Sequence, residues 1–483
     1  MLQNLLQNKK MLAIIGGIVI IGIMAAAFFW PRQEPIPTAQ NQAVTLTWWK
    51  PFYGNDTYDK IIDDFRALPG NQNVTINIIN KQYNSEYYGD LISDIARDSG
   101  PDIFTIRNDD LPAYKEFMTP NRIFQGGVLT DYKSDFADIV VRDTMDRDSV
   151  YAIASYVDNL QLYYNETILA QEGIALPPRT WSELDRQLSR LNERDTNSLN
   201  FRQHAIALGT GGRGLDGGEN INRHVDIMPM LLFQNGGQMY DYTSNSVIFG
   251  SQRDQALINS GQSTDAGFSV QTDSRGIQNT PAFNAIRFYA DFADVTRSRY
   301  SWNTASVNNV DAFAEGRLAY LISFSYMQDI LADKNPRLDY GISTLPQLDL
   351  DFKKTYGFFF MDGINRNLEL DPGKALERRT AESFLYFLSE YEQQREFVVQ
   401  TRLPAARKDL VAEQIEGDEV LRIFAEGSLY ADNYYKPDVI ATERIWSDLM
   451  ERVQYEGMPI EDSLDIAINQ YRAMVNDGPR LRN

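Results

Sequence analysis

Short runs typical of β-strands alternate with amphipathic helical segments from residue 44 onward. The first elements expected from this pattern, in chain order, are Val44–Trp49, Asp59–Leu68, Val74–Ile79, Ser85–Asp98 and Asp102–Ile106. The second and fourth of these segments are helical, and in Asp59–Leu68 the apolar residues Ile61, Ile62 and Phe65 fall on one face. Regular alternation of strand and helix predicts a mainly parallel sheet with helices on both sides.

Capping residues and helical periodicity predict further helices. Thr180 stands three residues before Glu183, a capping box in which each side chain satisfies an unpaired backbone N–H group. The following helix carries Leu184, Leu188 and Leu191 on one face. More helices are expected at Thr280–Val295, Arg379–Phe397 and Ile460–Met474, and the glycine-rich segment Thr210–Asn220 is expected to be an exposed loop.

The N-terminal segment indicates where the protein resides. Met11–Trp30 contains no charged residue, and as a helix it is about 30 Å long, enough to cross a membrane. Lys9 and Lys10 predict a cytoplasmic tail at residues 1–10 by the positive-inside rule. A cleaved signal peptide ending near Ala25–Ala27 is the alternative, although its apolar core is usually only about 7–15 residues long. We therefore expect a single-pass anchor in the cell membrane, a proline-rich linker at residues 31–43, and an extracellular or periplasmic domain.

Composition removes several classes of function. The chain has no cysteine, which excludes thiolate zinc sites, redox pairs and cysteine nucleophiles, and its two histidines, His204 and His224, make a His-based metal centre unfavourable. A formal net charge of −20 argues against a nucleic-acid partner. The G-x-G-x-x-G pattern at Gly209–Gly214 continues into a loop, whereas a dinucleotide site needs a helix there. We expect no cofactor and no metal.

Aromatic and polar residues that follow predicted strands are candidates for binding a ligand. Trp48, Trp49 and Tyr53 follow the first strand, as does Asp56, and Arg107–Asp110 follows the third. Ligands of open α/β sheets collect at the carboxyl ends of strands. A sugar presents flat C–H faces to aromatic rings and hydroxyl groups to carboxylate, amide and guanidinium groups. The alternative for each aromatic residue is a place in the core.

Four segments together resemble the extracellular solute-binding proteins of family 1, the sugar-binding components of ABC importers, which include maltose-binding protein. These segments are Tyr151–Trp181, Phe233–Gly237, Ala312–Ala319, and Phe384–Phe397 followed by Leu403-Pro404-Ala405. Each is a loose pattern, but their order and spacing match the family, and the resemblance extends from Val44 to Met474.

The resemblance implies a two-lobed periplasmic-binding-protein-like fold of type II. Lobe 1 would comprise residues 44–157 and 360–432, and lobe 2 would comprise residues 158–359 and 433–483. A carbohydrate, expected to be an oligosaccharide, would bind in the cleft between the lobes and be delivered to ABC permease subunits after hinge closure. By this resemblance the protein is not an enzyme, and its exported part is a monomer.

The resemblance and the strand-end positions together select one set of ligand-binding candidates. These residues are Trp48, Trp49, Tyr53, Asp56, Arg107, Asp109, Asp110, Tyr156, Asp158, Tyr326 and Asp362. Tyr156 and Asp158 would lie at the first crossing between lobes, and Gly357–Asp362 at the second. Tyr326 stands where the family usually has a sugar-stacking tryptophan.

Two other functions stay open at this level. A carbohydrate-active enzyme could use a pair of carboxylates that is not visible in one dimension. The same two-lobed module could instead serve as a sensor for a peptide or a polyamine. Many relatives carry a lipid on a cysteine, which this chain lacks, so membrane attachment would depend on Met11–Trp30.

Overall fold

The computed structural model describes residues 42–84, 86–194, 201–215, 217–241, 246–249 and 280–478. The chain divides into two compact units, Met1–Pro37 and Thr38–Asn483, and only the second contains described residues. The expected cytoplasmic tail and the expected anchor Met11–Trp30 lie outside them. Within the described ranges, no helix is both long and apolar enough to cross a membrane.

Lobe 1 is built around a six-stranded sheet in the order β2-β1-β3-β17-β4, with β7 also pairing with β17. The strands are β1 (Val44–Lys50), β2 (Val74–Asn80), β3 (Ile103–Arg107), β4 (Met118–Thr119), β7 (Ala152–Ala154) and β17 (Phe360–Asn365). β1 runs parallel to β2 and β3, as predicted, whereas β17 is antiparallel to its neighbours. Helices α3 (Asn55–Ala67) and α16 (Ala375–Leu388) pack against β1 through Tyr58 and Phe384, which both contact Trp48.

Lobe 2 contains a five-stranded sheet in the order β10-β11-β14-β9-β15. Its strands are β9 (Gln161–Asn165), β10 (Glu193–Arg194), β11 (Phe201–Ile206), β14 (Leu318–Ser323) and β15 (Tyr340–Ser343). This sheet corrects the expectation of mainly parallel pairing, because among these strands only β11 and β14 pair in parallel. The cause is β9, which enters from the other lobe and lies between β14 and β15, antiparallel to both.

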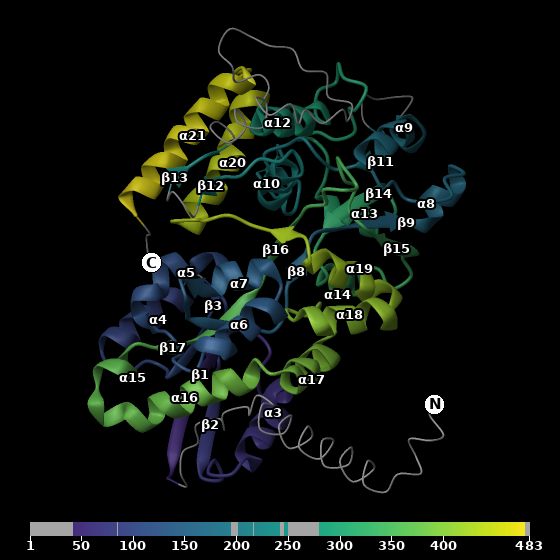
Figure 1. Ribbon diagram of the computed structural model, residues 1–483. Helices are drawn as coiled ribbons and strands as arrows, with labels where there is room; N and C mark the ends of the chain where they lie inside the picture. Colours follow the sequence, from purple (N-terminus) through teal and green to yellow (C-terminus); the bar gives the residue numbers. More distant parts are fainter. Residues whose placement is uncertain are drawn as a thin grey trace, which may run out of the picture. The chain divides into compact units, whose positions relative to one another are not determined.

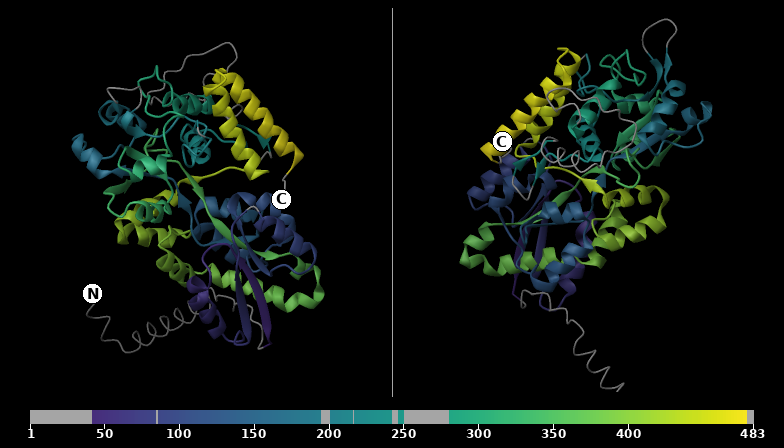
Figure 2. Two further views of the ribbon diagram at one scale, coloured as in Figure 1. Left: turned by 180° about the vertical axis from the view of Figure 1, so that it is seen from behind. Right: turned by 45° about the horizontal axis from the view of Figure 1, so that its top comes forward.

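Helices cover both faces of the second sheet, as the sequence predicts. One face meets α9 (Trp181–Leu191), α10 (His224–Gln234), α12 (Pro281–Asp291), α20 (Val439–Gln454) and α21 (Ile460–Asp477). α20 and α21 lie side by side in both views of Figure 2. The other face meets α13 (Asn309–Ala314), α14 (Met327–Lys334) and α19 (Glu419–Ser428). α19 packs on this sheet through Phe424.

Three short strands connect the lobes and pair with one another in the order β18-β16-β8. They are β8 (Asp158–Asn159), β16 (Thr355–Phe358) and β18 (Ala431–Asp432). Figure 1 shows β16 and β8 where the two lobes meet. β8 contains Asp158 of the first expected crossing, whereas β16 overlaps only Gly357 and Phe358 of the second, because Phe360–Asp362 belongs to β17. Because the three crossings share backbone hydrogen bonds, they form one hinge rather than three independent linkers.

Local sequence signals predicted most element positions, with three differences. Thr180 caps α9 by accepting from the Glu183 N–H at 3.2 Å, but the Glu183 carboxylate accepts from the N–H of Arg179, one residue earlier than a capping box predicts. The helix expected at Arg379–Phe397 is two helices, α16 and α17 (Tyr391–Thr401), separated where the Ser389 hydroxyl donates to a carbonyl of the preceding turn. The glycine-rich loop begins buried, at Thr210–Gly212, rather than fully exposed.

Candidate functional site

The first crossing is tied to lobe 2 by a buried carboxylate. Asp158 accepts hydrogen bonds from the backbone N–H and the hydroxyl of Ser325, at 3.0 and 2.9 Å. Burial raises the pKa of Asp158 to about 6, although these hydrogen bonds oppose the shift. The turn between β14 and α14, which holds Ser325 and Tyr326, is therefore fixed to the hinge.

Aromatic rings from both lobes form a continuous strip beside this turn. The aromatic strip consists of Phe52, Tyr83 and Phe360 from lobe 1, Phe358 at the second crossing, and Phe324 and Tyr326 from lobe 2. Neighbouring ring centroids lie 4.8 to 6.1 Å apart. All of these side chains except Phe324 are partly or fully exposed, and Phe52 is 40% exposed. Both lobes therefore contribute exposed aromatic surface to the strip.

Six charged side chains from both lobes meet beside the strip. The interlobe charge cluster consists of Arg107 and Asp109 from the end of β3, Arg223 and Asp226 at the start of α10, and Lys436 and Glu443 beyond β18. The Lys436 ammonium lies 3.2 Å from both Asp109 and Glu443, and Arg107 lies 2.7 Å from Asp109. Arg107 also approaches Glu443 at 3.8 Å, and this contact joins the two lobes.

Contacts with the aromatic rings link the charge cluster to the strip. The Arg223 guanidinium lies 4.9 Å from the centre of the Phe324 ring, a cation–π contact. Arg223 adopts a left-handed backbone conformation with φ of 66°, which costs an L residue about 1–2 kcal/mol. Such strain persists only where the surrounding structure enforces it, and it commonly marks functional positions.

Burial and opposite charges act against each other within the cluster. Burial alone would lower the pKa of Lys436 and of Arg107, but nearby acidic groups, including Asp109 and Glu443, raise both above their usual values. Burial raises the pKa of Asp226, and Arg223 only partly offsets this effect. Mutual pairing thus favours the charged forms of Lys436 and Arg107, whereas burial favours the neutral form of Asp226.

Several polar atoms of the cluster lack hydrogen-bond partners. Among the described residues, no hydrogen bond reaches the Nε atoms of Arg107 and Arg223 or either carboxylate oxygen of Asp226, which has only its ion pair with Arg223. A buried polar atom left unsatisfied costs about 1–3 kcal/mol. Of these three residues, Arg223 also lines the hollow that adjoins the cluster.

A hollow of about 780 Å³ adjoins the cluster, with Arg223 and Glu443 in its wall. The glycine-rich loop forms another side, and His224 lies in the hollow with its Nε2 atom 2.7 Å from the Ser447 hydroxyl. Burial lowers the pKa of His224 to about 4, so this ring is neutral at pH 7. In the part of the chain that the structure describes, no group of side chains is arranged to hold a metal ion.

A family model for bacterial extracellular solute-binding proteins matches residues 60–421, which is most of the chain. The chain belongs to this family. Its members bind substrates and are not enzymes, which removes the carbohydrate-active enzyme from consideration. No curated protein matches this solute-binding protein.

Solved structures of sugar-binding proteins share the fold. The cyclic α-maltosyl-1,6-maltose binding protein of Arthrobacter globiformis is 18% identical, with a TM-score of 0.67, and the match covers 90% of this chain and 100% of that one. A cyclo/maltodextrin-binding protein complexed with maltotetraose is 14% identical, with a TM-score of 0.66 and coverage of 93% and 100%. The sugar-binding protein MalE of Xanthomonas citri is 16% identical, with a TM-score of 0.64 and coverage of 90% and 98%. At these identities the likeness establishes the two-lobed fold.

The predicted site residues of this solute-binding protein fall into three groups. Arg107 and Asp109 lie in the charge cluster, Tyr326 lies in the aromatic strip, and Asp158 fixes the turn that carries Tyr326. Tyr156 is buried next to the first crossing, which contains Asp158. These five lie in or beside the interlobe region.

Four other predicted residues are buried in lobe 1. Trp48 and Asp362 face each other in the core of lobe 1, where the indole donates to the carboxylate at 3.0 Å. Trp49 is buried under Lys81. Asp110 is buried and accepts from Tyr88.

Two further candidates flank the region. Tyr53 packs against Tyr156 and Phe397, with centroid distances of 5.8 and 5.6 Å. Asp56 is exposed in the first turn of α3.

Sequence reasoning did not identify four residues of the charge cluster, Arg223, Asp226, Lys436 and Glu443. Each belongs to a segment that matches no strand-end pattern, and they meet only because α10, α20 and β18 converge. The sequence held one local signal for this region. Asp438, which follows Lys436-Pro437, is a residue type typical of helix N-caps, and it caps α20.

Proposed function

We propose that this solute-binding protein captures an oligosaccharide between its lobes and presents it to the permease of an ABC transporter. The observation that carries the proposal is the aromatic strip beside the interlobe charge cluster, with both lobes contributing to each. A ligand in contact with both lobes is bound best when they are closed, so it shifts the population toward the closed form.

The chemistry of the strip and the cluster suits a sugar. Exposed ring faces can stack on the C–H faces of pyranose rings, as Tyr326 and Phe52 are placed to do. Sugar hydroxyls both donate and accept, so they could satisfy the Asp226 carboxylate and the Arg107 and Arg223 Nε atoms. A purely apolar ligand would leave all of these atoms unpaired.

The ligands named for proteins of the same fold favour an oligosaccharide as the candidate. The proteins of similar fold are named for binding cyclic α-maltosyl-1,6-maltose or were crystallised with maltotetraose. We therefore propose an oligosaccharide of glucose units as the first ligand to test.

The extracellular side of the membrane is the expected place for this capture, because the family is extracellular. We propose that Met11–Trp30 anchors the chain to the cell membrane and that residues 31–43 act as its tether. Delivery to a permease follows if the permease recognises the closed form.

Calorimetry tests the proposal. The full chain, held in a mild detergent, is titrated with maltose, maltotetraose and a cyclic glucan, and with spermidine as a cationic comparison. We expect heat with at least one glucan, and weaker heat when Arg223 is changed to Ala. Heat with spermidine alone would instead indicate the polyamine sensor, and no heat with any glucan would refute the proposed ligand.

A further inference from the structure

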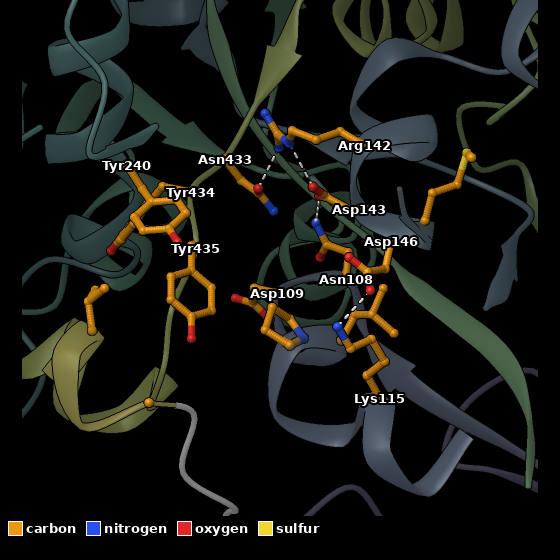
Figure 3. Close-up of a pocket in the computed structure, with 15 residues that line it drawn as sticks. Asn108, Asp109, Lys115, Arg142, Asp143, Asp146, Tyr240, Asn433, Tyr434 and Tyr435 are labelled. Carbon is orange, nitrogen blue, oxygen red and sulfur yellow. Dashed lines mark hydrogen bonds and ion pairs between the residues drawn. The ribbon is translucent and has the colours of Figure 1, made fainter. Parts of the chain in front are cut away.

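A second cavity lies between the lobes, separate from the aromatic strip. It has a volume of about 450 Å³ and is lined by residues of both lobes (Figure 3). Tyr240 and Tyr435 lie on one side, and Asn108, Asp143 and Lys115 lie on the other (Figure 3). None of the six rings of the aromatic strip lines it.

The charge cluster separates this cavity from the strip. Asp109 is the only cluster residue that lines the cavity, and its carboxylate pairs with Arg107 and Lys436. A molecule in the cavity therefore lies beyond these ion pairs and does not reach the aromatic strip.

Arg142 forms a rigid boundary of the cavity. Its guanidinium donates to Asp143 at 2.8 Å, to Asn433 at 2.6 Å and to Asp432. Because Arg142 belongs to α7 (Asp138–Thr144) in lobe 1 and Asn433 directly follows β18, these bonds hold the third crossing against lobe 1. The cavity is thus built on fixed elements.

One buried donor points into the cavity without a partner. Asn433 is 5% exposed, and its amide oxygen accepts from Arg142. Its amide nitrogen has no hydrogen-bond partner among the described residues and is directed toward the cavity centre (Figure 3). A buried amide in this state requires an acceptor, which a ligand oxygen would supply.

The remaining walls define the ligand further. The charged residues of the lining are already paired, as Lys115 is with Asp146 at 2.8 Å, so the cavity offers no unpaired charge to an ionic ligand. The rings of Tyr240 and Tyr435, with centroids 4.9 Å apart, form an aromatic wall. A neutral molecule with a flat C–H face and several hydroxyl groups matches both the wall and the free amide.

We propose that this cavity is a second carbohydrate site, for a neutral monosaccharide or disaccharide, distinct from the site of the proposed function. Tyr240 and Tyr435 stack on the sugar ring, and the Asn433 amide donates to one of its oxygens. The volume of about 450 Å³ falls in the usual range of small-molecule sites.

Thiol protection tests this site directly, because the natural chain has no cysteine. Met145 lines the cavity, so the Met145→Cys variant carries a single thiol there. Iodoacetamide alkylation of the full chain is followed by mass spectrometry with and without saturating maltose. Alkylation slows in proportion to the unoccupied fraction, so 90% occupancy gives about a tenfold decrease. The matched control is Val399→Cys on α17, where Val399 is 62% exposed, and its rate should not change.

Two further changes separate the second site from the first. Adding Asn433→Ala to Met145→Cys should weaken protection, and Tyr435→Leu serves the same purpose if loss of Asn433 prevents folding. Adding Tyr326→Ala instead, which weakens the proposed primary site, should leave protection intact.

The opposite pattern overturns the inference. Protection that disappears with Tyr326→Ala and survives Asn433→Ala and Tyr435→Leu would mean that the thiol only reports lobe closure. Absence of protection by maltose, or protection by spermidine instead, would also refute a neutral sugar site. Calorimetric heat with glucans in the unmodified chain is judged separately, so failure of either proposal can be recognised without the other.

Discussion

A buried ion pair in lobe 1 allows a quantitative test of what Asp362 does. The Asp362 carboxylate accepts from Lys50 at 3.0 Å, from the Trp48 indole at 3.0 Å and from the Thr105 hydroxyl. Side chains of the pair are 5% and 4% exposed. Burial lowers the pKa of Lys50, and the interaction with Asp362 opposes this shift. The geometry assigns Asp362 to the stability of lobe 1 rather than to ligand contact.

The expected cost of removing this carboxylate is large. Asp362→Ala removes the counter-ion of the buried Lys50 ammonium and the acceptor of the Trp48 indole, although Lys50 keeps the Tyr58 hydroxyl and Thr105 keeps the Trp49 carbonyl as acceptors. Removing one partner of a buried ion pair costs about 3–5 kcal/mol. Lys50 can lose its proton, which limits the penalty. We therefore expect the free energy of unfolding to decrease by an amount within this range and not by more.

Urea denaturation followed by tryptophan fluorescence measures this change. The matched control is Asp56→Ala, since Asp56 is an exposed carboxylate at the start of α3. The double variant Lys50→Met with Asp362→Leu should recover most of the loss, because an apolar pair of similar volume avoids the desolvation cost. A loss below about 1 kcal/mol for Asp362→Ala, or a double variant no better than the single one, would refute the reasoning.

Three further predictions concern the interlobe region and α9. Tyr326→Ala should weaken glucan binding by about 5- to 30-fold through loss of ring contact, whereas Val399→Ala should not change it, and calorimetry compares them. Asp158 has a raised pKa of about 6, so the folded state binds its proton more tightly than the unfolded state, whose value is about 3.9. The stability that Asp158 contributes therefore falls as the pH rises from about 4 to 6, and Asp158→Asn should flatten this part of the urea midpoint profile; identical profiles would contradict this. Thr180→Ala should lower the free energy of unfolding by about 1 kcal/mol, because Thr180 caps α9, and an unchanged urea midpoint would argue against the cap.

Hydrophobic periodicity predicted where the first strands lie in the sequence, but not the direction in which strands pair. It placed β1, β2 and β3 within one or two residues, because each has a buried face that the sequence reveals. It could not show that β9 and β17 run against their neighbours, since alternation is the same in either direction. Strand direction depends on where the chain enters a lobe, which is a tertiary property.

The candidate site was predictable only where it follows a strand. Arg107 ends β3 and Asp109 follows it by two residues, so their position was visible in the sequence. Trp48 was misjudged, although Val44 and Leu46 share its face of β1 and are buried with it, a pattern that itself indicates the core. Glu443 could not be predicted because only the convergence of distant segments brings it to the cluster.

The interleaving of the two lobes along the chain has a consequence for biosynthesis. β1, β2 and β3 are translated first, but β17, which pairs along β3, is translated only after every strand of the second sheet. At about 5–20 residues per second, the ribosome takes on the order of tens of seconds to make the intervening chain. Throughout that interval the apolar edge of β3 lacks its partner and is open to aggregation. A chain that is exported only after translation is complete meets all its partner strands at once, so post-translational secretion suits this topology.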